Sequence, residues 1–265
     1  MPAALVTGAS SGIGAAFSRQ LARAGYDLIL VARDESRLDL LAGQLHDEHG
    51  AVVQVLAADL ATDDGIAAVS DQARGVDLLV NNAGFGNPAP FGAASLDDEL
   101  RMLKVHCEAV LRLTSAALAG MAAAGATPAA SPAASTVRRG VINVASVSAF
   151  TGRGSYGASK AWMVSFTLGV AADLATQHRP EHVMALCPGL TRTEFHQRAG
   201  MGVAGVPNFM WLDADRVVAD AMRDFRNGGT VCVPGLQYKA IVALARIAPP
   251  TLAARLGSRT GRRYK

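Results

Sequence analysis

A short apolar segment, a glycine-rich turn and a helical pattern follow one another at the start of the chain. Residues 3–7 lead directly into a turn that contains Gly8, Gly12 and Gly14, and the helical pattern after it stops at Gly25. The backbone N–H groups of such a turn, together with the N-terminus of the following helix, suit the binding of a pyrophosphate. Gly8 permits the tight turn, and the other two glycines let the backbone approach a ligand and the sheet closely. The spacing is G-x-x-x-G-x-G rather than G-x-G-x-x-G, so a simple tight turn is the alternative.

Strand-like and helix-like segments alternate along the rest of the chain. The buried strands are expected at residues 3–7, 27–32, 52–57, 77–80, 141–145, 183–186 and 230–233. The longer helices between them are expected at residues 36–49, 63–74, 97–121, 155–177 and 213–226. Such alternation favours a parallel sheet with right-handed crossovers and helices on both faces. We therefore expect a three-layer, doubly wound α/β fold with a mostly parallel, seven-stranded sheet.

Length and composition exclude several classes of protein. The chain has 265 residues, 50% of them hydrophobic, which is enough for one large domain. A net charge of +3 does not suggest a nucleic-acid partner. Cys107, Cys187 and Cys232 have neither metal-ligand nor disulfide-framework spacing, so we expect no metal site and a reducing compartment. No signal-peptide pattern opens the chain and no apolar run reaches the ~20 residues that span a bilayer, which favours the cytoplasm.

The end of the second expected strand carries information about a nucleotide. An acidic residue at this place often bonds the ribose 2′-hydroxyl of NAD, but here the residues are Ala32 and Arg33. A guanidinium suits a 2′-phosphate, so NADP is favoured over NAD. Asp34 follows the arginine and is expected to cap the next helix. The alternative is that Arg33 is only a solvated surface charge.

Tyr156 and Lys160 are four residues apart, which on a helix puts both side chains on one face. A tyrosine is a poor acid or base near neutral pH, because its ordinary pKa is about 10. A cation held beside it favours the phenolate and lowers that pKa. Such a pair can exchange a proton with an oxygen during carbonyl reduction or alcohol oxidation. The spacing alone fits a solvated helix face equally well.

Other candidate residues come directly after expected strands. They are Asp59 and Leu60, Asn81 to Gly84, Ser146, and Pro188 to Thr193. In open α/β sheets this carboxyl edge is where ligands bind.

Taken together, these residues resemble the short-chain dehydrogenase/reductase family, from Ala3 to about Val233. The resemblance rests on five signatures that occur in the family's order, namely Thr7-Gly8-x-x-x-Gly12-x-Gly14, Asn81-Asn82-Ala83-Gly84, Ser146, Tyr156-x-x-x-Lys160 and Pro188-Gly189. It implies a Rossmann fold and an NAD(P)-dependent oxidoreductase. It places one domain in residues 1–235, with a substrate loop at about 192–212, an Ala/Pro/Ser-rich insertion at about 122–139, and a helical, basic tail in residues 236–265.

The resemblance also implies roles. Tyr156 would be the general acid/base, Lys160 would bond the nicotinamide ribose and lower the tyrosine pKa, and Ser146 would hold the substrate oxygen. The implied cofactor contacts are Gly8, Gly12, Ile13 and Gly14 at the pyrophosphate, Ser10 and Ser11 near the adenosine phosphates, Asp59 and Leu60 at the adenine, Asn81, Ala83 and Gly84 on its ribose side, and Pro188, Gly189, Leu190 and Thr193 at the nicotinamide.

The sequence departs from the family at His106, where an asparagine is usual. In the family the backbone carbonyl of that residue holds a water that relays protons from the lysine, and a histidine keeps the carbonyl. We favour a structural substitute that hydrogen-bonds in place of the amide over an imidazole that titrates. Ser146 precedes Tyr156 by ten residues, so the connecting loop must be short, and Ser148 is a second candidate that lies closer still. A basic residue common before the second glycine is Ser11 here, so the NADP prediction depends on Arg33 alone.

The predicted function is an NADP(H)-dependent oxidoreductase that interconverts a ketone or aldehyde and an alcohol. Large apolar residues in the substrate loop indicate a hydrophobic small-molecule substrate, namely Phe195, Met201, Val203, Phe209, Met210 and Trp211. The alternative is a cofactor-binding sensor or scaffold without turnover. The helices at 97–121 and 155–177 resemble those that pair across subunits, so a homodimer or homotetramer is expected. For the tail, a cover over the active site or a disordered basic end is favoured over an amphipathic helix at a membrane.

Overall fold

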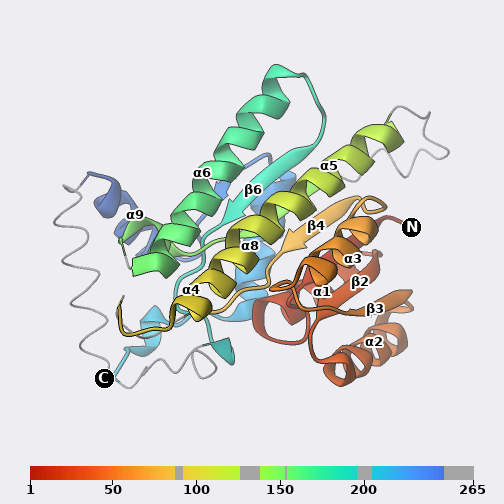
Figure 1. The fold of residues 1–265 in the computed structure, drawn as a ribbon, viewed down its shortest axis with the longest axis horizontal. Helices are drawn as coiled ribbons and strands as arrows, with labels where there is room; N and C mark the ends of the chain where they lie inside the picture. The colour runs from red at the N-terminus through yellow and green to blue at the C-terminus, as the bar shows by residue number, and fades with distance from the viewer. Residues whose placement is uncertain (87–91, 126–137, 153, 196–204, 248–265) are drawn as a thin grey trace.

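The computed structural model describes residues 1–86, 92–125, 138–152, 154–195 and 205–247 (Figure 1). Seven strands form one sheet in the order β3-β2-β1-β4-β5-β6-β7, and all neighbouring strands are parallel. The strands are β1 (Ala3–Thr7), β2 (Asp27–Ala32), β3 (Val53–Ala57), β4 (Leu78–Asn81), β5 (Gly140–Val144), β6 (His182–Leu186) and β7 (Val231–Cys232). The chain changes its direction of travel across the sheet between β1 and β4, which is the switch point where such folds bind ligands. The predicted doubly wound α/β fold is confirmed.

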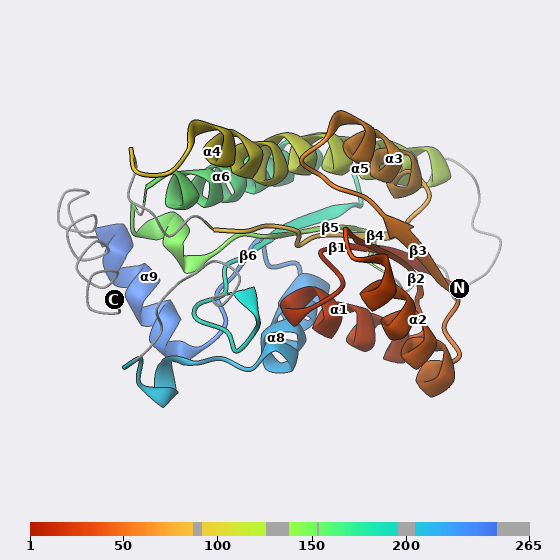
Figure 2. The same ribbon diagram turned by 60° about the horizontal axis from the view of Figure 1, so that its bottom comes forward.

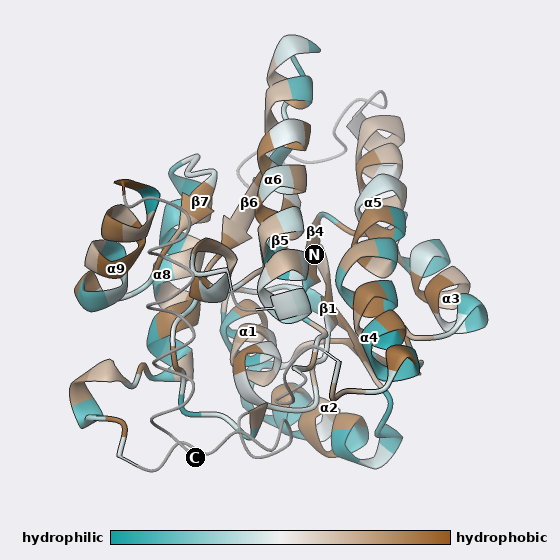
Figure 3. Ribbon diagram, turned by 60° about the vertical axis from the view of Figure 1, so that its left-hand side comes forward, coloured by the Kyte–Doolittle hydropathy of each residue, from teal (hydrophilic) through white to brown (hydrophobic). Residues whose placement is uncertain are grey.

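Helices cover both faces of the sheet, as the edge-on view in Figure 2 shows. One layer holds α1 (Gly12–Arg23), α2 (Glu35–His49) and α8 (Ala214–Arg226). The other holds α3 (Asp63–Ala73), α4 (Leu96–Leu103), α5 (Val110–Gly125) and α6 (Gly154–Thr176). A last helix, α9 (Leu236–Ile247), lies at the end of the molecule beyond β6. Figure 3 shows apolar residues along α9, and among them Leu236, Leu244 and Ile247 are exposed.

The helices begin where the sequence supplies a capping side chain. Asp34 accepts a hydrogen bond from the Arg37 backbone N–H at the start of α2, as predicted. Thr62 and Asp213 cap α3 and α8 in the same way. Each cap satisfies one of the N–H groups that a helix leaves without an internal acceptor, typically worth about 1 kcal/mol.

The core has two main parts, one on each face of the sheet. Phe17 of α1 and Phe225 of α8 are fully buried on one face, beside strand residues such as Leu28 and Leu30. On the other face, Ile66 of α3 and residues of α5 pack on β1, β4 and β5. Close packing of aliphatic side chains on both faces explains why the strand sequences are apolar almost without interruption.

The expected helix at 97–121 is wrong in one respect, because it is not one continuous α-helix. A π-helical turn, η1 (Lys104–Ala109), separates α4 from α5 and contains His106. A π turn adds a residue to the hydrogen-bonded loop and is frequent at functional sites. A π turn of this kind could not be predicted from the sequence, because one inserted residue barely changes the spacing of the apolar residues along a helix. The combined segment Leu96–Ala124 is long and apolar enough to cross a membrane by length and composition, but it packs on α3, β4 and β5 as a core helix.

Several predicted segments fall partly outside the described residues. These are the Ala/Pro/Ser-rich insertion, of which α5 takes the first residues up to Gly125, the middle of the substrate loop, and the basic part of the tail beyond residue 247.

Truncation of Phe17 to alanine should lower the free energy of unfolding by about 3–5 kcal/mol, because it removes a fully buried ring and leaves a cavity. Leu40 on α2 is 70% exposed, so Leu40→Ala should change the same quantity by less than about 0.5 kcal/mol. Urea titrations of both variants and the wild type measure the difference. Equal effects from the two substitutions would contradict the described packing of α1.

Candidate active site

Two polar residues join the glycine-rich turn to the end of β4. The Asn82 amide donates to the Thr7 carbonyl at 2.8 Å and to the Gly8 carbonyl at 3.2 Å. In return, the Thr7 hydroxyl oxygen accepts from the backbone N–H groups of Asn82 and Ala83, each at 2.9 Å. These four bonds hold the first loop and the fourth strand end in one arrangement. The sequence reasoning missed both side chains as fixing groups, although each stands within a signature that it had recognised.

The glycine-rich turn has the close approach expected of a phosphate cradle. A Cβ atom on Gly14 would lie 2.2 Å from the Gly8 carbonyl oxygen, so no larger residue fits there. α1 begins at Gly12, and its first N–H groups have no acceptor inside the helix. Ser10, Ser11 and Ile13 are half-buried around this helix end. A helix N-terminus with free N–H groups and a positive dipole end fits a pyrophosphate.

The edge of β2 carries two arginines rather than one. Arg33 follows the strand directly and is exposed. Arg37, in the first turn of α2, donates to Glu194 at 2.9 Å and also lies 3.4 Å from Asp34. Glu194 belongs to the start of the predicted substrate loop, so this ion pair joins the ends of β2 and β6 through their loops. Arg37 was not singled out in the sequence because its helical position resembled that of an ordinary surface charge.

The predicted adenine-side residues differ in what their side chains do. The Asp59 carboxylate accepts from the Ala61 N–H at 3.0 Å, which shapes the turn after β3, and Leu60 is buried. Asn81 is buried, and its amide donates to Thr114 at 3.1 Å and to Asn143 at 2.9 Å. Its Oδ1 atom has no hydrogen-bond partner in the described part of the chain. Both donors of the Asn81 side-chain amide are therefore used within the core, so a cofactor contact by Asn81 would have to come from another of its atoms.

Tyr156 and Lys160 lie together at the start of α6. The lysine Nζ atom is 5.9 Å from the centroid of the tyrosine ring, and it donates to the Val144 carbonyl at 2.9 Å. Lys160 is only 3% exposed. The Tyr156 ring also meets the rings of His106, at 5.7 Å edge to face, and Phe195, at 6.3 Å. The tyrosine is therefore held in a small aromatic cluster beside a buried ammonium group.

Burial lowers the pKa of Lys160 to about 8, well below its ordinary value of 10.5. The neighbouring thiols of Cys107 and Cys187 would oppose this shift in the pKa of Lys160 only as thiolates. Burial in turn raises the pKa of Cys187 to about 12, so this thiol is neutral near pH 7 and offers no counter-charge. The ammonium is thus cationic at neutral pH but poorly stabilised.

Ser146 and Pro188 bring the ends of β5 and β6 together. The Ser146 Oγ atom accepts from the Ser148 N–H at 3.1 Å and caps the short 3₁₀-helix η3 (Val147–Phe150), so its own proton stays available to a substrate oxygen. The Val147 N–H donates to the Pro188 carbonyl at 3.0 Å. As predicted from the spacing, little chain separates η3 from α6, which starts at Gly154.

Tyr238 of α9 covers the loop after β6 and was not anticipated as a site residue. A Cβ atom on Gly189 would lie 2.1 Å from the Tyr238 ring, so the ring packs directly on that glycine. Its hydroxyl accepts from the Leu190 N–H at 3.0 Å and donates to the Met210 carbonyl at 2.6 Å. Thr193 lies farther along, and a Cβ atom on Gly12 would come within 3.0 Å of it. This loop therefore reaches back over the glycine-rich turn.

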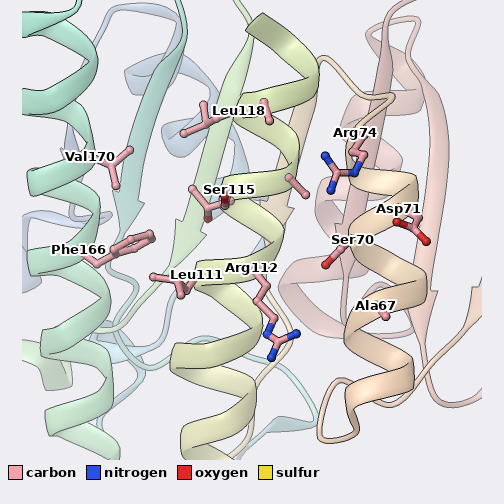
Figure 4. Close-up of a pocket in the computed structure, with 13 residues that line it drawn as sticks. Ala67, Ser70, Asp71, Arg74, Leu111, Arg112, Ser115, Leu118, Phe166 and Val170 are labelled. Atoms are coloured by element: carbon pink, nitrogen blue, oxygen red, sulfur yellow. The ribbon is translucent and has the colours of Figure 1, made fainter. Parts of the chain in front are cut away.

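A shallow depression lies elsewhere on the surface, between α3, α5 and α6 (Figure 4). Leu111 and Leu118 of α5 and Phe166 and Val170 of α6 line one side of it, and Arg74 lines the other. It includes none of the predicted site residues, so it belongs to a different surface.

The fold and this edge define a nucleotide-binding α/β oxidoreductase of the Rossmann class. The chain matches the family model described as short chain dehydrogenase over residues 2–202. It is 32% identical over 196 residues to serine 3-dehydrogenase of Agrobacterium fabrum, covering 72% of both chains. Among solved structures, a short-chain dehydrogenase from Sphingobium yanoikuyae in complex with NADPH is 32% identical, with a TM-score of 0.79 over 93% of this chain and 94% of that one. The bulky-bulky ketone specific alcohol dehydrogenase from Comamonas testosteroni is 29% identical, with a TM-score of 0.76 over 93% and 92% of the two chains.

The chain therefore belongs to the short-chain dehydrogenase family. It is an NAD(P)-binding oxidoreductase that acts on CH–OH groups of small molecules.

Substitution of Lys160 by methionine should change how stability depends on pH. The folded pKa of about 8 lies below the ordinary 10.5, so between these values the unfolded chain binds more protons than the folded one. Wild-type stability therefore gains a contribution as pH rises through this window. The free energy of unfolding of Lys160→Met minus that of the wild type should fall by about 3 kcal/mol across the whole window. Denaturant titrations at pH 7, 8.5 and 9.5 follow this decline, and a constant difference would contradict the burial of a charged Lys160.

Proposed function

We propose that the protein is an NADP(H)-dependent oxidoreductase that interconverts a hydrophobic ketone or aldehyde and the corresponding alcohol, with Tyr156 as general acid/base. The observation that carries the proposal is the buried ammonium of Lys160 beside the Tyr156 ring. A cation at this place favours the phenolate, and so does the N-terminus of α6, where the tyrosine lies in the first turn. Together they suit Tyr156 to hold or release a proton at its hydroxyl near neutral pH.

The other residues of this edge bind and orient. The nicotinamide, when bound, supplies or accepts the hydride. The glycine-rich turn and the start of α1 would hold the pyrophosphate, and Asp59, Leu60, Asn81, Ala83 and Gly84 would border the adenosine. Pro188, Gly189, Leu190 and Thr193 would border the nicotinamide. Ser146 would donate its free hydroxyl proton to the substrate oxygen, and Lys160 would hold the nicotinamide ribose. Fixing reactants in this way accounts for much of the rate gain in such reactions.

The preference for NADP is supported by charge at the end of β2. Arg33 is exposed there, Arg37 lies in the first turn of α2, and no acid takes the place that would bond a ribose 2′-hydroxyl. Arginine binds phosphate through several N–H groups in a fixed plane. The relative from Sphingobium yanoikuyae was solved with NADPH, which agrees with this choice.

The preference for a hydrophobic substrate is supported by the surroundings of the tyrosine. The Phe195 ring lies 6.3 Å from the Tyr156 ring, and the Phe85 ring lies 6.2 Å from that of His106. Other members of the predicted apolar cluster contribute less, because Phe209 is 70% exposed and Met201 and Val203 lie outside the described residues. The Comamonas relative is specific for bulky ketones, whereas the Agrobacterium relative is named for serine, so the apolar rings carry this part of the proposal.

We also propose a homodimer or homotetramer that pairs through α5 and α6. Leu111 on α5 is 46% exposed, and the depression in Figure 4 places Phe166 and Val170 of α6 across from it. Burying such a face against a second copy would remove apolar surface from water. The cytoplasm stays the predicted location, and the basic part of the tail, for which a membrane role was the less favoured prediction, lies outside the described residues.

Tyr156→Phe should reduce turnover by at least about 100-fold, because the general acid/base is lost, while cofactor binding changes little. Reduction of a panel of aryl ketones and fluorescence titration with NADPH measure the two effects. Tyr26→Phe is the matched control, because Tyr26 is buried under α1 away from the active edge. Full activity in Tyr156→Phe would overturn the mechanism, and NADPH binding by a wild type that reduces and oxidises nothing in the panel would favour the sensor or scaffold.

Arg33→Ala should raise the Kd for NADPH by about 10–100-fold, since a charge-assisted contact to the 2′-phosphate is lost. The Kd for NADH should stay unchanged. Arg23→Ala, at the opposite end of α1, controls for the loss of a positive charge. Equal losses for both cofactors, or none, would contradict the role of Arg33 in NADP preference.

A further inference from the structure

His106 lies at the centre of the active edge, in the π turn between α4 and α5, and is fully buried. Its Nε2 atom accepts a hydrogen bond from the Phe85 backbone N–H at 3.3 Å. Its Nδ1 atom is 2.9 Å from the Ser159 hydroxyl. That hydroxyl donates to the Tyr156 backbone carbonyl at 2.8 Å. One imidazole therefore connects the loop after β4 to the turn of α6 that carries the tyrosine.

The protonation of this imidazole follows from its partners. The Phe85 N–H is always a donor, so Nε2 must be the unprotonated nitrogen. A neutral imidazole has one N–H, which must then be on Nδ1 and donate to Ser159. The Ser159 hydroxyl keeps its own proton and donates it to the Tyr156 carbonyl. Each of the three donors, the Phe85 N–H, the His106 Nδ1–H and the Ser159 hydroxyl, therefore has an acceptor. The imidazolium would instead put an N–H against the Phe85 N–H.

Charge and space around the ring agree with a neutral histidine. Burial lowers the pKa of His106 well below its ordinary value, and the neighbouring Lys160 ammonium lowers it further. In the described part of the chain, the titratable groups that face the ring are Lys160 and Tyr156, both from α6. A Cβ atom on Gly84 would lie 2.7 Å from Nε2 and 3.5 Å from the Lys160 Nζ atom, so the loop backbone packs directly against both side chains.

We propose that His106 is a positioning residue, which holds the Gly84–Phe85 backbone and the Tyr156 turn of α6 in one register through a fixed, neutral Nδ1–H tautomer and Ser159. The inference deepens the proposed function and rests on it, because it assigns the arrangement of Tyr156 to a side chain that does not itself meet the substrate. An asparagine reproduces the donor and acceptor of this arrangement in a shorter side chain. The imidazole is longer than an asparagine side chain, and the π turn places the backbone of His106 so that the ring lies between Phe85 and Ser159.

The tautomer is tested directly by NMR, without any measurement of activity. Full-length protein labelled with ¹⁵N in its six histidines is compared with His106→Asn, which assigns the His106 signals. Two-bond ¹H–¹⁵N correlations should show Nδ1 protonated and Nε2 unprotonated, unchanged from pH 8 to pH 5.5. A protonated Nε2, or a ring that titrates in this range, would overturn the proposal even if every variant lost activity.

The positioning role is tested with kcat in a double-mutant cycle. His106→Leu should lower kcat by about 100-fold, as expected for a small displacement of a catalytic group. Ser159→Ala should lower it comparably, and the double variant should be no worse than the poorer single one, because both break the same connection. His106→Asn should recover at least about ten-fold over His106→Leu. Multiplying losses in the double variant, or no recovery with asparagine, would overturn the proposal.

A matched control separates positioning from loss of stability. Leu113→Ala removes a buried side chain of α5 on the sheet face, outside the hydrogen-bonded chain. It should lower Tm as much as His106→Leu does or more, yet leave kcat unchanged. A parallel fall of kcat in Leu113→Ala would show that general destabilisation explains the His106 variants. If Tyr156→Phe keeps full activity, the proposed function fails, while the NMR result still decides the tautomer.

Discussion

The active edge depends on one costly arrangement, the burial of the Lys160 ammonium under the end of β5. Taking a cation out of water is unfavourable unless its protons are bonded, and Val144 supplies one carbonyl for this purpose. The nearest thiols are neutral at pH 7 because burial raises their pKa, so they do not compensate the charge. The pKa of Lys160 is lowered because burial disfavours its charged form and no neighbouring anion among the described residues stabilises it at neutral pH. A protein that keeps such a group sacrifices stability for an electrostatic field at the neighbouring tyrosine.

The surrounding polar residues make the arrangement rigid. Asn81, Asn143, Thr114 and Thr167 bond one another between β4, β5, α5 and α6. Such a network inside an apolar core has few alternative packings, because each change leaves a buried donor or acceptor unpaired. Asn82 and the buried Thr7 do the same between the ends of β4 and β1. α6 and the glycine-rich loop are therefore connected through side chains as well as through the sheet.

Much of the fold could be predicted from the sequence, because its signals are local. The strand bounds agree within a residue or two, since continuous apolar runs between glycines and capping residues mark them. Helical spacing alone put Tyr156 and Lys160 on one face of a helix, whereas their role as a catalytic pair was predicted from the family resemblance. The π turn could not, because one extra residue in a helix barely changes its hydrophobic pattern. Arg37 and Tyr238 were missed for another reason, since their partners lie far away in the chain and no local pattern marks a contact across such a separation.

The packing of Tyr238 on Gly189 has a consequence for the order in which the protein forms. Domains fold as units and the N-terminal part leaves the ribosome first. The first loop and β1 to β5 can begin to pair while synthesis continues, although β5 and α6 still need β6, and α1 still needs α8, to complete their packing. The nicotinamide side is different, since the Leu190 N–H gains its acceptor only when α9 arrives. The strands around the glycine-rich turn thus come early in the chain, whereas the loop after β6 is completed only by a helix that follows all seven strands.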